Sequence, residues 1–336
     1  MSTVLGVKSS DLNKMCTILK NLVPSGSVEI PLGISVENGT LKLICTQGVV
    51  YVGTCETEFS GNVSTNILYY DITPLLNSTG DVSITFNNND VTFDGEGFSA
   101  KFALSYSVVT EPDIPEIHLH DVDPNQYLTG IKNILGAGFN KLYGIQSPII
   151  FLGNIALQKF PNTWLQTRVQ SLDLQAILDF DHVKLLSIFC PTKISLTDEG
   201  SLVLVNSKGI LMLPYKPVVD ASNITMLLKD MKPAAQVNIA HYLDRLKNMS
   251  KLNSKANCMI SVNAQGLRSA IKNANSTLTA YAGNIGGEIL KVFYLPIQLW
   301  LCILKGLQSE YIEVLLGGDK VCLRTQSVVI VTHVLH

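Results

Sequence analysis

The chain has 336 residues, of which 46% are hydrophobic and 15% charged, so it can bury several cores and is not a disordered polymer. Its net charge of −2 does not indicate a nucleic-acid-binding protein, and its seven cysteines, without a Cys-x-x-Cys pair, argue against a disulfide framework or a zinc ribbon. The N-terminal segment lacks the apolar core of a signal peptide, and the most apolar stretch, Leu295–Leu304, is about half the length of a membrane span, so we expect a cytoplasmic protein without membrane association.

Two proline-rich segments divide the chain into three similar lengths. They are Glu111–Pro124, with three prolines, and Pro214–Pro217, with two. Proline lacks a backbone N–H and disfavours helix in the residue before it, so both segments predict breaks. We therefore expect domains at residues 1–112, 113–217 and 218–336. The first holds 5 Lys/Arg against 11 Asp/Glu, and the last holds 12 against 7.

Each expected domain opens with an amphipathic helix. The predicted helices span Ser10–Val23, Asn125–Leu135 and Asn238–Leu252, and in each the apolar residues recur every three or four positions. Their starts are spaced by about 114 residues, which favours an internal repeat. The alternative is coincidence, because helices and strands alternate in many chains.

A second helix and a β-hairpin follow in each expected domain. The second helices are predicted at Tyr70–Asn77, Leu172–Asp179 and Pro296–Lys305, and the hairpins begin near residues 82, 194 and 312, each with polar or glycine turn residues. The same order at the same period predicts an α+β fold of three tandem domains, each with two helices packed on antiparallel sheets.

No catalytic motif is present, so we expect no enzyme and no cofactor. The best metal candidate is the pair His118 and His120, which would share one face of a strand, but a solvated linker is the favoured interpretation. Asp179 and Asp181 are two residues apart at a predicted helix end and point to different sides, so a solvated helix face is favoured over acid–base chemistry. The sequence thus predicts no metal site and no catalytic residue.

Basic residues recur on the opening helices. They are Lys14, Lys20, Lys132, Arg245, Lys247 and Lys251. In the third opening helix, Arg245, Lys247 and Lys251 lie off the apolar stripe. They could contact DNA phosphates without reading bases, and the alternative is an ordinary solvated helix face.

The element order resembles that of the bacterial type of DNA sliding clamp, the processivity factor of replicative polymerases. Local stretches are also similar, namely the strand–turn–strand at Val36–Thr46, the last helix and hairpin at Leu299–Val321, and the final strand at Ser327–Leu335. The family's Thr-Asp-Gly-His-Arg segment is absent, with Phe151–Ile155 standing about there. The usual Pro-Met-Arg ending is replaced by Thr332–His336.

The resemblance implies a function and partners. Two chains would close head to tail into a homodimeric ring of six domains. The helices of the ring would face duplex DNA and contact it without regard to sequence. A clamp loader would open the ring, and the ring on DNA would tether a DNA polymerase. The departures suggest a distant, phage-encoded member. The alternatives are a β-rich phage structural or assembly protein and an enzyme without a recognisable motif.

The resemblance also implies a pocket for partner peptides between the middle and last domains. The matching residues are Leu152, Gly153, Pro217, Val218, Val331, His333 and Leu335. Most are apolar or small, which suits a short hydrophobic motif. The alternative is that Val331 and Leu335 are ordinary core or edge-strand residues.

Overall fold

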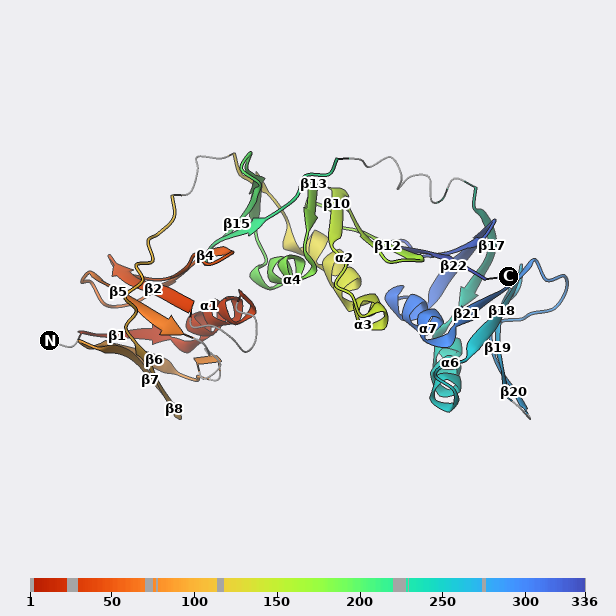
Figure 1. Cartoon of the computed structure of the whole chain (residues 1–336), viewed down its shortest axis with the longest axis horizontal. Coiled ribbons are helices and arrows are strands. Elements are labelled where there is room, and N and C mark those ends of the chain that lie inside the picture. The colour runs from red at the N-terminus through yellow and green to blue at the C-terminus, as the bar shows by residue number, and fades with distance from the viewer. Residues whose placement is uncertain are drawn as a thin grey trace. The chain divides into compact units, whose positions relative to one another are not determined.

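The computed structural model describes residues 3–22, 30–69, 75–76, 78–113, 118–219, 228, 230–273 and 276–335. Figure 1 shows the elements of the chain, which forms two compact units. The first unit comprises Met1–Pro124 and Lys184–Tyr215, and the second comprises Asn125–Val183 and Lys216–His336. The division of the chain into three domains stays a prediction. The residues expected to form the middle domain are shared between the two units.

The first unit contains two antiparallel sheets. Its elements are β1 (Thr3–Lys8), α1 (Ser9–Leu22), β2 (Ile30–Glu37), β3 (Thr40–Cys45), β4 (Val50–Glu56), β5 (Val63–Tyr69), β6 (Asp81–Phe86), β7 (Asp90–Gly95), β8 (Phe98–Ala103), β9 (His120–Asp121), β14 (Lys193–Leu196), β15 (Ser201–Asn206) and β16 (Gly209–Pro214). One sheet has the order β1-β6-β7-β8 and the other β5-β2-β3-β4-β16-β15-β14-β9. In the larger sheet, β4 and β16 pair across the predicted domain boundary.

The second unit repeats this plan. Its elements are α2 (Pro124–Gly136), α3 (Phe139–Tyr143), β10 (Ile149–Gly153), β11 (Ile155–Lys159), β12 (Thr163–Arg168), β13 (Leu174–Leu178), β17 (Lys232–Asn238), α6 (Ala240–Leu252), β18 (Asn257–Asn263), β19 (Gly266–Asn273), β20 (Ser276–Gly283), β21 (Lys291–Pro296), α7 (Ile297–Gly306), β22 (Tyr311–Gly317), β23 (Lys320–Arg324) and β24 (Val328–His333). The sheets are β13-β10-β11-β12-β24-β23-β22-β17 and β20-β19-β18-β21. Helix α4 (Phe180–Phe189) contains the division between the two units.

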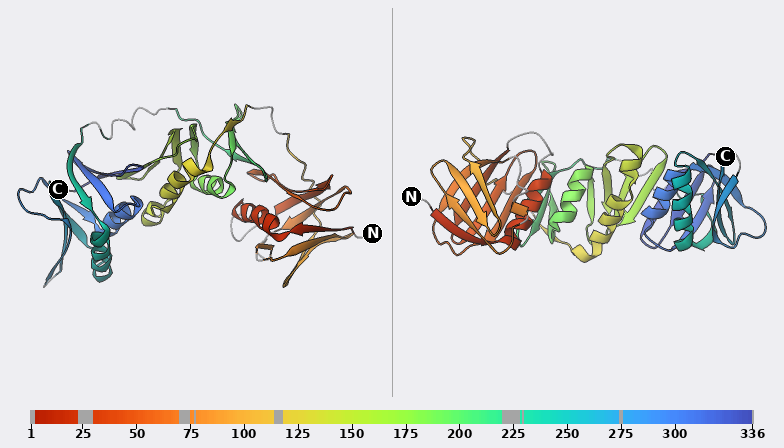
Figure 2. Two further views of the ribbon diagram at one scale, coloured as in Figure 1. Left: turned by 180° about the vertical axis from the view of Figure 1, so that it is seen from behind. Right: turned by 90° about the horizontal axis from the view of Figure 1, so that it is seen from below.

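The helices bury one apolar face against the sheets. In α1 the buried side chains include Leu12, Met15 and Leu19, which recur at helical spacing. Within the second unit, α2, α3 and α7 lie on one face of the eight-stranded sheet (Figure 1, Figure 2). The three opening helices and the helix after Pro296 are thus confirmed. Val23, the expected end of the first helix, lies outside the described residues.

One predicted helix is wrong. Leu174–Leu178, expected to be helical, forms strand β13, which pairs with β10, and the helix begins two residues later at Phe180. Burial alternates along the strand, with Leu174, Ala176 and Leu178 inside, so the period is two rather than 3.6. The helix expected at Tyr70–Asn77 falls mostly outside the described residues.

The three predicted hairpins are confirmed as β6–β7, β14–β15 and β22–β23. Each has the polar or glycine turn that two antiparallel strands require. Among the described residues, no helix combines the length and the apolar character needed to cross a membrane.

Candidate nucleic-acid interface and partner groove

Positive charge is concentrated on the helices. In the described helices we count nine Lys/Arg and three Asp, an excess of six positive charges in a chain of net charge −2. All the other residues together therefore carry a net −8. This separation gives the helix surfaces a positive potential that the overall charge conceals.

Helix α1 holds two of the predicted DNA-binding residues. Lys14 and Lys20 are exposed, and the ammonium of Lys14 lies 3.6 Å from the Asp11 carboxylate. The same carboxylate lies 3.1 Å from the ammonium of Lys208, in the β15–β16 turn. Hydrogen bonding from Lys208 lowers the pKa of Asp11. Two lysines thus converge on one carboxylate and leave an excess positive charge beside the helix.

Helix α6 holds three predicted residues on its solvent side. Tyr242 and Leu246 are buried and fix the orientation of the helix, which leaves Arg245 and Lys251 exposed. Lys247 is half-buried and forms a 2.8 Å ion pair with Asp244, whose pKa is lowered by that lysine. The sixth predicted residue, Lys132, is exposed on α2.

Four further basic side chains belong to this set, although the sequence pattern alone did not reveal them. They are Lys141 on α3, Lys184 on α4, Lys305 on α7 and Lys208 in the β15–β16 turn, and all are at least partly exposed. Lys305 ends a correctly predicted helix and could have been included. The sequence predicts the neighbouring helix at Leu172–Asp179, whereas it spans Phe180–Phe189, so Lys184 lies outside the predicted helix. Lys208 joins α1 only through the tertiary fold.

A hollow of about 340 Å³ lies beside α1 in the first unit. Lys14, Lys208 and Asn206 line it, and Met15, Ile18, Tyr51 and Phe189 contribute apolar surface. The turn that carries Lys208 is anchored by two hydrogen bonds. The Lys208 carbonyl accepts one from the Thr54 N–H, and the Asn206 side-chain amide donates one to the Phe189 carbonyl. This anchoring holds the Lys208 ammonium near α1.

The seven predicted pocket residues fall into two groups. Leu152 and Gly153 lie in β10, and Pro217 and Val218 follow Lys216, whose backbone bonds with Ile177 of β13. The other group is Val331 and His333 in β24, with Leu335 beyond it. Between β10 and β24 lie β11 and β12, so at about 4.8 Å per strand these two strands are roughly 14 Å apart.

The register separates the two groups further. Leu152 pairs with Ile155, which pairs with Arg168, and the N–H of Arg168 donates to the Ser327 carbonyl. Leu152 is therefore level with the start of β24, whereas His333 ends that strand. The two groups of predicted pocket residues therefore lie on strands three positions apart and at different levels of the sheet.

Val331 belongs to the core rather than to a surface. It is 3% exposed and packs with Leu315 and Cys322, against which Leu228 and Met231 also pack. Trp164 and Val329 pack against the same cluster, so the Val331 side chain is covered by its neighbours. For Val331 the structure thus shows the alternative interpretation, a core side chain.

Leu335, by contrast, belongs to an exposed apolar strip. It is 67% exposed and forms two backbone hydrogen bonds with Tyr294 of β21. Four further exposed apolar residues lie in β21 or directly before it, namely Ile289, Leu290, Val292 and Tyr294. Beside it, the His333 imidazole lies 2.8 Å from the Asp319 carboxylate, and this hydrogen bond lowers the pKa of Asp319. We call Ile289, Leu290, Val292, Tyr294 and Leu335 the C-terminal strip. Its β21 members were missed because nothing in the sequence shows that β21 and Leu335 are neighbours.

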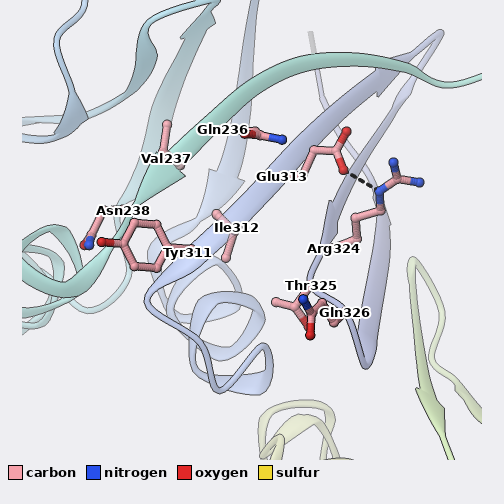
Figure 3. A pocket seen from close by; sticks show the side chains of 9 residues that line it. All are labelled: Gln236, Val237, Asn238, Tyr311, Ile312, Glu313, Arg324, Thr325 and Gln326. Carbon is pink, nitrogen blue, oxygen red and sulfur yellow. Dashed lines mark hydrogen bonds and ion pairs between the residues drawn. The ribbon is translucent and has the colours of Figure 1, made fainter.

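A second hollow, of about 560 Å³, lies on the edge of the eight-stranded sheet at β17, β22 and β23 (Figure 3). All of its lining residues except Val237 and Ile312 have polar groups in their side chains, and the Arg324 guanidinium forms an ion pair with Glu313 at 2.6 Å. The hollow offers hydrogen-bonding groups, and its lining residues include no nucleophile paired with a base.

Metal ligands are not gathered in the described part of the chain, where no group of three or more His, Cys, Asp or Glu is placed to hold an ion. His118 and His120 are exposed, with ring centroids 5.1 Å apart in an edge-to-face contact. All seven cysteines are free thiols.

Solved structures of bacterial DNA polymerase III beta subunits are similar to this chain along its whole length. The beta subunit of Thermotoga maritima is 11% identical, with a TM-score of 0.79 and coverage of 100% of both chains. The Helicobacter pylori beta clamp bound to a DNA ligase peptide is 12% identical, with a TM-score of 0.75 over 99% of this chain and 100% of that one. The beta subunit of Borrelia burgdorferi is 11% identical, with a TM-score of 0.75 over 99% of both.

No protein-family model and no curated protein matches the sequence. At such low identity the likeness is one of fold, and it confirms the expected α+β class with the architecture of the bacterial beta clamp.

Proposed function

We propose that this protein is a DNA sliding clamp, a non-enzymatic ring that encircles duplex DNA and tethers a polymerase. The observation that carries the proposal is that its fold matches beta-clamp structures from end to end, with 99–100% of both chains covered. This coverage does not support the alternative of a phage tube or capsid protein. In the Helicobacter pylori structure, the clamp is bound to a DNA ligase peptide.

The charge distribution supports the same proposal. A ring that slides must hold DNA by enclosure and make weak, exchangeable phosphate contacts. Nine basic side chains on the described helices meet that need, and the acidic remainder keeps the net charge at −2. Because the contacts are to phosphates, binding would not depend on base sequence.

A homodimer can form through strands that end a sheet among the described residues of each unit. The four-stranded sheets end in β1 and β8 and in β20 and β21. The β1 edge accepts a hydrogen bond from Thr57, and the β21 edge pairs with Leu335. We therefore place the head-to-tail contact at β8 of one chain and β20 of the other, because unpaired edges readily add a strand.

The partner site is placed at the C-terminal strip. Exposed apolar residues on and beside β21, which the Tyr294–Leu335 pairing joins to the end of the described chain, suit the hydrophobic side chains of a short linear motif. Of the predicted pocket residues, His333 and Leu335 belong to or border this strip, whereas Leu152, Gly153, Pro217 and Val218 do not. The polymerase and the clamp loader are the partners we assign to it.

Retention on DNA tests the ring. The protein is loaded onto a nicked circular plasmid by its clamp loader with ATP, and its co-elution with the DNA is followed by gel filtration before and after a restriction enzyme linearises the circle. A clamp stays on the circle and leaves the linear form. Equal retention on both forms, or polymerisation of the protein into tubes, would overturn the proposal.

A further inference from the structure

The acidic residues on the helices follow one rule. Three acidic side chains occur in the described helices, and each precedes a lysine by three positions. The pairs are Asp11–Lys14, Asp181–Lys184 and Asp244–Lys247. Residues three apart on a helix are neighbours, so each carboxylate can reach its lysine.

Two of these three Asp–Lys pairs form ion pairs in the structure. Asp244 lies 2.8 Å from Lys247, and Asp11 lies 3.6 Å from Lys14 and 3.1 Å from Lys208. The lysines lower the pKa of both aspartates, which are therefore ionised at neutral pH. Each carboxylate thus occupies an ammonium group that would otherwise be available to a DNA phosphate.

We propose that Asp11 and Asp244 weaken DNA binding by competing with DNA phosphates for the lysines beside them. This inference rests on the proposed sliding function. A lysine must leave its aspartate to reach a phosphate, so each contact forms against an existing ion pair and stays short-lived. The aspartates set an upper limit on affinity, which a ring that must slide requires.

The alternative role for these aspartates is positioning, and it predicts the opposite sign. If Asp11 and Asp244 aim the lysines at DNA, removing the carboxylates would weaken binding. If they compete with DNA, removal would strengthen it. Asn is the substitution of choice because it keeps the shape of the side chain and removes only the charge.

The test measures binding of a fluorescein-labelled linear duplex of mixed sequence to the full-length protein, by fluorescence anisotropy at several salt concentrations. We expect Asp244→Asn to bind about two- to fivefold more tightly, the range that a surface ion pair supports. Asp11→Asn should gain more, because it releases both Lys14 and Lys208. Adding Lys247→Ala to Asp244→Asn should remove the gain.

The matched control is Asp198→Asn, which makes the same change of net charge at an exposed position after β14. Equal gains in Asp198→Asn and Asp244→Asn, or weaker binding by the two helix variants, would overturn the inference while leaving the clamp proposal intact. No measurable binding by the wild type or any variant at low salt would overturn this inference, whereas the clamp proposal is overturned only by the retention experiment on circular DNA. Thermal unfolding confirms that the variants are folded.

Discussion

At the scale of single residues, the basic side chains of α6 are the most direct probe of DNA contact. Replacing Arg245, Lys247 and Lys251 together by Ala should weaken DNA binding and lower the slope of log affinity against log salt, by up to about 0.9 for each lost phosphate contact. The loss should be equal for different DNA sequences, because phosphates carry no base information. Anisotropy titrations on two unrelated duplexes measure both quantities.

Exposed strand residues provide the control for this triple variant. Lys193→Ala and Lys232→Ala remove charge from β14 and β17 rather than from a helix, so both should bind DNA as the wild type does. A loss that differed strongly between the two duplexes would indicate direct base recognition instead.

Leu335 is the residue that tests the partner site. Leu335→Asp places a charge in the C-terminal strip and should weaken binding of the cognate polymerase at least about tenfold, as expected for a central hydrophobic contact. Surface plasmon resonance without DNA measures the effect. Leu252→Asp is matched in chemistry and, at 69% exposed against 67%, in exposure, and it should bind normally. Equal losses in both variants would contradict the assignment.

At the scale of elements, the sequence predicts local features well and tertiary partners poorly. Gly317, Gly318 and Asp319 predict hairpin β22–β23 correctly, because a turn depends on its own residues. Strand β13 was misread, because its apolar residues fit a helix until the pairing with β10 is known. Lys208 and the C-terminal strip were missed for the same reason, since each depends on segments far apart in sequence.

The β4–β16 pairing has a specific weak point at Gly209. Its φ of 142° is unfavourable for other residues, and a Cβ there would overlap the carbonyl oxygen of Val52. Gly209→Ala should therefore destabilise the fold by about 2–3 kcal/mol, measured by denaturant unfolding. Gly286→Ala is the control, because nothing lies within 4 Å of its added Cβ, and it should change stability little. Equal changes in stability for Gly209→Ala and Gly286→Ala would show that the contact between β16 and β4 tolerates a side chain at residue 209.

At the scale of the whole molecule, the charge asymmetry bears on assembly. The first 112 residues have a balance of −6 and the last 119 a balance of +5, and a head-to-tail dimer would bring these ends together. Complementary potentials favour such encounters at low salt. The dimer should therefore dissociate several-fold more readily at high salt, as measured by sedimentation equilibrium.

A charge reversal near the proposed interface sharpens this test. Lys272 lies on β19, next to the β20 edge, and Lys272→Glu should weaken the dimer and reduce its dependence on salt. Lys255→Glu changes the net charge equally in a turn after α6 and should dimerise normally. A dimer constant that did not change with salt would rule out the electrostatic contribution.

The two eight-stranded sheets also govern how the chain could be divided. Strand β4 has β16 as its neighbour, so a fragment ending at residue 112 would lose that partner and expose the backbone of Val50–Gly53. Such a fragment would aggregate by itself and would be rescued by supplying residues 113–336 in trans, whose β16 carries the missing edge. A split version of this protein is therefore best obtained by co-expressing the two fragments. Each fragment then supplies the strand, β4 or β16, with which the other fragment pairs.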